Sequence, residues 1–126
     1  MDEGAKNSIQ DLYINSQTIT GEIANDTKSK FDNMAQTVIN GYEKQKNDSI
    51  SKLQELFTKQ KDLTAQEQAD IMQKATTYYT NQETQTQSYE DQINQIMQNA
   101  SNEHRSLTSQ EVTDIGQLQN QMRELS

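Results

Sequence analysis

The chain has 126 residues and a formal net charge of -8, and only 30% of its residues are hydrophobic. Asn, Gln, Ser and Thr occupy 53 of the 126 positions, whereas a globular domain normally has about 45–50% apolar residues. This composition excludes a thick hydrophobic core, and the lack of cysteine excludes disulfides and thiolate metal sites. No apolar run approaches the ~18 residues of a membrane span, so we expect no membrane insertion.

The first predicted element is a long helix over about 4–61. Proline is absent from the chain and its four glycines are dispersed, which favours long helices. Apolar residues recur here every eleven positions, or three helical turns, and therefore stay on one face of a nearly straight helix. The rows of this packing seam contain Leu12, Ile23, Phe31, Met34, Tyr42, Leu53 and Leu56.

The second half of the chain changes to a seven-residue period, which is typical of a left-handed coiled coil. Its seam contains Met72, Tyr79, Ile93 and Ile96. The pattern then shifts by one residue, and a new run begins with Ile115, Leu118 and Met122. We predict helices over about 64–105 and 108–125.

A repeated segment marks the starts of these two helices. Leu63-Thr64-Ala65-Gln66-Glu67 recurs 44 residues later as Leu107-Thr108-Ser109-Gln110-Glu111, and Ile19-Thr20-Gly21-Glu22 lies one period earlier. The repeats thus start near 19, 63 and 107, a period typical of helical arrays. Since 44 residues of α-helix span about 66 Å, the repeat points to length as a candidate function.

The two clear copies of the repeat also match the capping box S/T-x-x-E. We predict helix caps at Thr64 with Glu67 and at Thr108 with Glu111. Short breaks before these caps favour antiparallel neighbouring helices. The expected fold is all-α, a single elongated helical unit over 1–126 with coiled-coil-like packing and no sheet. An antiparallel hairpin, an elongated bundle and a kinked continuous rod use the same apolar stripes.

Candidates for chemistry are few in this sequence. His104 is the sole histidine, and no further His or Cys lies at a metal-ligand spacing. The acidic neighbours Glu67 with Asp70 and Glu90 with Asp91 are best interpreted as solvated surface and capping charge, because catalytic carboxylates need a pocket. We predict no catalytic residue, no metal site, no cofactor and no enzymatic activity.

The charge distribution argues against direct nucleic acid binding. Residues 1–62 hold eight basic and ten acidic residues, and residues 63–126 hold three basic and nine acidic ones. No basic residue lies between Lys74 and Arg105. A protein that binds nucleic acid needs a basic stripe to neutralise phosphates, and this sequence has none.

The stretch from Lys59 to Ile71 resembles the recurring helical segments of tail tape-measure proteins from long-tailed phages and prophages of Gram-positive bacteria. Those segments show a charged helix end, then Leu-Thr/Ser-x-x-Glu, then an amphipathic helix rich in Gln, Asn, Lys and Glu. The resemblance covers about residues 45–126. The chain departs from the family pattern over 76–99, where it is poorer in Lys and richer in Thr and Gln.

The resemblance implies a structural virion protein and a longer parent chain. Copies would lie along the lumen of the tail tube and set tail length, with the chain itself and tail-tube proteins as partners. The alternative is a coiled-coil scaffold or interaction module unrelated to phage. A signalling hairpin in the bacterial cytoplasm and a helical part of a secreted bacterial protein belong to that class, although the eleven-residue rows argue against a strict heptad hairpin.

Overall fold

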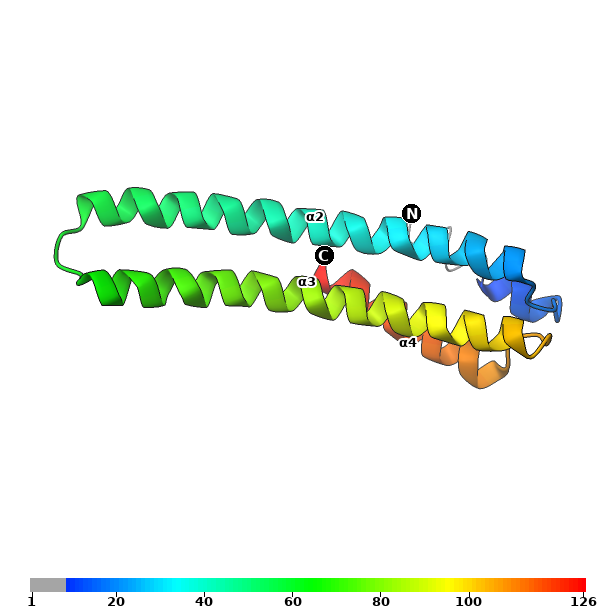
Figure 1. The fold of residues 1–126 in the computed structure, drawn as a ribbon. Coiled ribbons are helices and arrows are strands. Elements are labelled where there is room, and N and C mark those ends of the chain that lie inside the picture. Colours follow the sequence, from blue (N-terminus) through cyan, green and yellow to red (C-terminus); the bar gives the residue numbers. More distant parts are fainter. Residues whose placement is uncertain (1–8) are drawn as a thin grey trace.

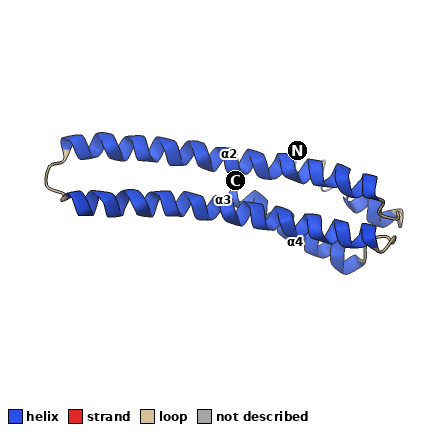
Figure 2. Cartoon of the chain, viewed as in Figure 1, coloured by secondary structure: helices blue, strands red, loops and turns tan. Residues whose placement is uncertain are grey.

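The computed structural model describes residues 9–126 and is all-α, as the sequence predicts. After a short helical segment at 9–14, α2 (Gly21–Lys59) and α3 (Ala65–Asn102) form a long antiparallel hairpin (Figure 1). Helix α4 (Ser109–Leu125) folds back along one half of α3. Short loops join the helices, and residues 9–126 contain no strand (Figure 2).

Each 44-residue repeat corresponds to one helix and one turn. The helices begin directly after Thr20, Thr64 and Thr108, and each threonine accepts a hydrogen bond from the backbone N–H three residues later. Helices α2 and α3 have 39 and 38 residues. Each is therefore about 58 Å long.

The expected continuous helix over 4–61 is wrong, because the chain leaves the helix after residue 14 and begins α2 only at Gly21. Ser16 has a φ of 50°, the left-handed conformation that ends a helix. The sequence signal is weaker here because Ile23 stands where the other repeats have glutamate, so Thr20 caps α2 without a full capping box. The later helices follow the predicted ranges closely. The part of the predicted helix over residues 4–8 lies outside the described residues.

Two turns that are 88 residues apart in sequence meet at one end of the molecule. Thr18 and Ser106 form an isolated antiparallel bridge, and the Ile19 N–H donates to the Arg105 carbonyl at 2.9 Å. His104 has a φ of 52°, which matches Ser16 two repeats earlier. The chain therefore reverses direction at every repeat, and every second turn lies at the same end.

The core lies in the half of the hairpin that α4 and the 9–14 segment cover. Of the predicted seam, the structure buries Phe31, Met34, Tyr42, Ile93, Ile115 and Met122. Other residues of the predicted seam are half-buried, namely Leu12, Ile23, Leu53, Met72, Tyr79, Ile96 and Leu118.

Leu56 does not belong to the buried seam, because 45% of it is exposed. The Tyr42 hydroxyl donates to the Leu125 carbonyl and so marks where α4 ends beside the hairpin. Beyond Tyr42, α2 and α3 have only each other as neighbours within the described chain. Two helices leave one side of each apolar stripe uncovered, which explains the exposure of Leu56.

Candidate functional site

Arg105 holds the turn before α4 in a fixed shape. Its guanidinium forms a bidentate pair with Glu111, at 2.6 and 2.9 Å, and also bonds Glu103 at 2.7 Å. The hydrogen bonds from Arg105 lower the pKa of Glu111, so this carboxylate stays ionised. Glu111 also accepts from the Thr108 N–H at 2.9 Å, which joins the ion pair to the helix cap. These contacts organise the turn.

The predicted caps lie where the sequence places them. Glu67 accepts from the Thr64 N–H at 2.9 Å while the Thr64 hydroxyl accepts from the Glu67 N–H at 3.1 Å. Thr108 and Glu111 repeat this capping box with the same two distances. Each box satisfies two backbone donors that a helix start would otherwise leave unpaired.

The cap at Thr108 predicts a measurable loss of stability. We expect Thr108→Ala to lower the free energy of unfolding by about 1 kcal/mol, because the N–H of Glu111 loses its acceptor. Urea denaturation followed by circular dichroism measures this change. Thr84→Ala is the matched control, since Thr84 is exposed in the interior of α3 and alanine favours helix there. Equal stability of the two variants would contradict the role of the cap.

A carboxyl pair joins α2 to α3 in the covered half of the hairpin. Glu90 is 4% exposed, accepts from the Asn94 amide at 2.6 Å and shares a hydrogen bond with Asp32. Burial, together with the hydrogen bond and the charge of the neighbouring Asp32 carboxyl, raises the pKa of Glu90 to about 7. The same hydrogen bond lowers the pKa of Asp32, which also pairs with Lys28 at 2.8 Å. Below about pH 7 the protonated Glu90 therefore donates a hydrogen bond to the Asp32 carboxylate.

A second carboxyl pair lies further along the hairpin. Burial and a hydrogen bond with Glu43 raise the pKa of Glu83, and the same hydrogen bond lowers the pKa of Glu43. Lys46 bridges the two carboxyl groups, at 2.8 Å from Glu43 and 3.9 Å from Glu83. In both pairs the pKa of the α3 carboxyl is raised and the pKa of the α2 carboxyl is lowered, so each pair links the two helices through a hydrogen bond.

These pairs were not predicted from the sequence. The interpretation of Glu90 as solvated surface charge is wrong, because Glu90 is buried. The signal was present in the seven-residue spacing of Glu83, Glu90 and Met97, which puts both glutamates on the row of a buried methionine. Perturbed carboxyl groups are a common mark of active sites, but these two pairs also fit an ion network that orders packing.

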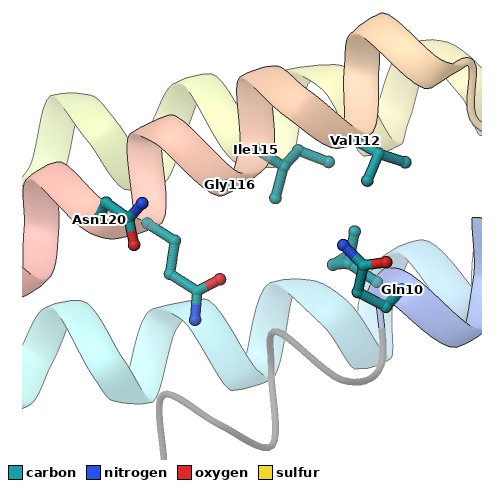
Figure 3. Close-up of a pocket in the computed structure, with 7 residues that line it drawn as sticks. Gln10, Val112, Ile115, Gly116 and Asn120 are labelled. Carbon is teal, nitrogen blue, oxygen red and sulfur yellow. The ribbon is translucent and has the colours of Figure 1, made fainter.

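The hollows of the surface are small or open. Figure 3 shows a pocket between the 9–14 segment and α4, where Gln10 faces Val112 and Ile115. Its volume is about 70 Å³, far below the roughly 300–1,000 Å³ of small-molecule sites. A polar groove of about 420 Å³ runs past the first carboxyl pair and is open to solvent. It is lined by Ala24, Asn25, Lys28, Asp32, Gln87, Glu90, Asp91, Asn94, Gln95 and Gln98.

Residues 9–126 hold no cluster of three or more His, Cys, Asp or Glu side chains suited to a metal ion. His104 is exposed in the turn before α4. Within the same residues, no helix combines the length and apolarity needed to cross a membrane.

Comparisons with protein-family models, with curated proteins and with solved structures found no match of any of the three kinds.

Proposed function

We propose that this chain is a structural helical-repeat module that acts through its length and its packing surfaces, not as an enzyme. The observation that carries the proposal is the spacing of the three helix caps, Thr20, Thr64 and Thr108, at 44 residues. A constant spacing between helix starts gives each unit the same axial length of about 58 Å. The carboxyl pairs between α2 and α3 serve packing between those units.

The tape-measure resemblance gives the proposal its most specific form. In that role, copies of the chain lie in the lumen of a phage tail tube, contact one another and the tube proteins, and set tail length. The net charge of -8 supports the role, because an acidic surface does not hold the DNA that passes through the tube. Antiparallel units do not add their lengths, so a ruler requires the hairpin to open. The turn at 60–64 contains neither Gly nor Pro, and its sequence permits a continuous helix.

The second candidate is a coiled-coil scaffold that works in the folded form, in bacteria but outside a phage particle. The antiparallel packing of α2 on α3 favours this candidate, because both carboxyl pairs form only when the hairpin is closed. A scaffold of this kind presents surfaces on a rod of fixed length.

Deleting residues 63–106 in the gene that encodes the chain tests the tape-measure role. The new junction joins Asp62 to Leu107 and keeps the Leu-Thr-x-x-Glu helix start intact. We expect tails shorter by about 66 Å in electron micrographs, because 44 residues of helix are lost. Duplicating the same segment is the matched control and should lengthen the tails equally. Unchanged tails in both strains, or a gene whose host makes no tails, would reject the ruler and leave the scaffold.

A further inference from the structure

The half of the hairpin beyond Tyr42 carries three large exposed apolar residues, Leu56, Ile71 and Tyr78, which we call the strip. This distal half consists of 43–59 of α2, the turn 60–64, and 65–82 of α3. Its large exposed apolar residues are Leu56 (45%), Ile71 (37%) and Tyr78 (55%). Figure 1 shows that α4 runs along only the other half of the hairpin. Large side chains with this exposure, gathered on one segment, are typical of an interaction surface.

On α3, Ile71 and Tyr78 of the strip belong to an exposed row of the helix. Beside α4, Gln92 and Ile96 of α3 line a shallow hollow together with Leu118. Ile71 and Tyr78 lie 21 and 14 residues before Gln92, which are whole numbers of heptads, so they share its face of α3. Gln92 is exposed as well, so the strip lies on a solvent-facing row of α3 next to the seam that includes Ile96.

On α2, the strip continues the face that reaches the end of α4. Leu56 lies fourteen residues, or two heptads, after Tyr42, whose hydroxyl donates to Leu125.

The distal half also differs from the rest of the chain in charge. Residues 43–82 hold six acidic and six basic residues, so the whole net charge of -8 lies outside them. Two copies that met through their other halves would repel each other, because like charges disfavour association. Two neutral distal halves meet without that cost. This combination of apolar surface and neutrality points to a second copy of the chain as the occupant.

We propose that two copies pack their distal halves together in antiparallel orientation and form a four-helix bundle over that length. A two-fold axis that crosses α3 between Lys74 and Ala75 places Ile71 opposite Tyr78 of the partner subunit, and Tyr78 opposite Ile71 of the partner subunit. Such an isologous contact needs only one apolar strip on each copy. Ala75 at the axis lets the two α3 helices approach closely.

The size of this contact fits a concentration-dependent dimer. Seventeen helical residues span about 25 Å, and two packed helices are about 20 Å wide, so each copy covers about 500 Å². The total of about 1,000 Å² lies at the lower end of specific interfaces. The inference deepens the proposed function, because it rests on a structural role and names the surface through which that module associates with itself.

Sedimentation equilibrium of the 126-residue chain tests the proposal. We expect the mass to rise from 14.4 kDa toward twice that value as the concentration increases into the high micromolar range. The double variant Ile71→Lys with Tyr78→Lys should stay monomeric over the same range, with unchanged helicity by circular dichroism. Ile14→Lys is the matched control and should dimerise like the parent, because Ile14 is 70% exposed but lies at the other end of the molecule. A parent that stays monomeric, or a double variant that dimerises, would overturn the proposal.

Crosslinking tests the orientation, because the chain contains no cysteine of its own. A short bismaleimide should crosslink Ala75→Cys into dimers, since residue 75 lies at the proposed axis. It should leave Asp62→Cys uncrosslinked, because antiparallel copies put their 60–64 turns at opposite ends. Crosslinking at residue 62 without crosslinking at 75 would overturn the antiparallel contact. Neither readout depends on tail length, so failure of the dimer and failure of the ruler are separate results.

Discussion

Replacing Phe31 with alanine should lower the free energy of unfolding by about 3–5 kcal/mol, the usual cost of removing a fully buried aromatic side chain. Phe31 is 0% exposed and lies in the core that the covered half of the hairpin shares with α4. The loss combines the transfer of the ring to water with the cavity that remains. Urea denaturation followed by circular dichroism measures the change.

Phe57→Ala is the matched control for this experiment. Phe57 belongs to the same helix, but it lies in the distal half and is only half-buried. We expect it to cost half as much or less, measured at low concentration where the chain is monomeric, because less of its surface leaves water on folding. Equal losses at positions 31 and 57 would mean that the core extends evenly along the hairpin, contrary to the structure.

The second large effect is a fall in stability as the pH rises from 4.5 to about 7. The folded-state pKa of Glu90 is about 7, above its ordinary value of 4.5, so the folded state binds more protons in this interval. Stability therefore decreases as the pH rises through the interval. Asp32 acts at lower pH in the opposite sense, because its pKa is lowered from 3.8 and its stabilisation is lost on acidification. Stability should therefore be greatest at a pH above the titration of Asp32 and below the titration of Glu90.

Thermal unfolding across this pH range, with Glu90→Gln for comparison, measures the effect. The glutamine is neutral at every pH and can still donate to Asp32, so the variant should lose most of the decline above pH 4.5. A smaller decline should remain, because burial also raises the pKa of Glu83. Glu55→Gln is the control, since Glu55 is exposed near the end of α2 and should leave the profile unchanged. A Glu90→Gln profile with the full decline would contradict the carboxyl pair.

The helix starts were predicted correctly where the sequence contains both residues of a capping box. Thr64 with Glu67 and Thr108 with Glu111 give both halves of a capping box, and α3 and α4 begin directly after those threonines. At Thr20 the glutamate is replaced by Ile23, and the eleven-residue apolar rows continue across the turn. Periodicity indicates which face of a helix is apolar. It does not reveal a short break in the helix when the apolar residues on both sides of the break keep the same spacing.

Other features depend on how the helices pair, which a single apolar stripe does not determine. The sequence left a hairpin, a bundle and a rod open, because all three bury the same stripes. Leu56 matches the buried residues of α2 in spacing and is exposed only because α4 ends beside Tyr42. Glu90 becomes a buried hydrogen-bond donor because α3 lies against Asp32 of α2. The site is thus a product of tertiary contact.

The chain reverses at every 44-residue repeat, so that turns two repeats apart meet. Gln17 and Asn102 are exposed beside the two turns that Thr18 and Ser106 join. Spin labels on Gln17→Cys and Asn102→Cys, in protein diluted with unlabelled chain, report their separation by double electron–electron resonance. The structure predicts a distance below about 25 Å, because paired backbones lie about 5 Å apart and the labels add the rest. A continuous helical rod would instead separate the two labels by about 130 Å, and loss of the short distance would contradict the folded-back repeat.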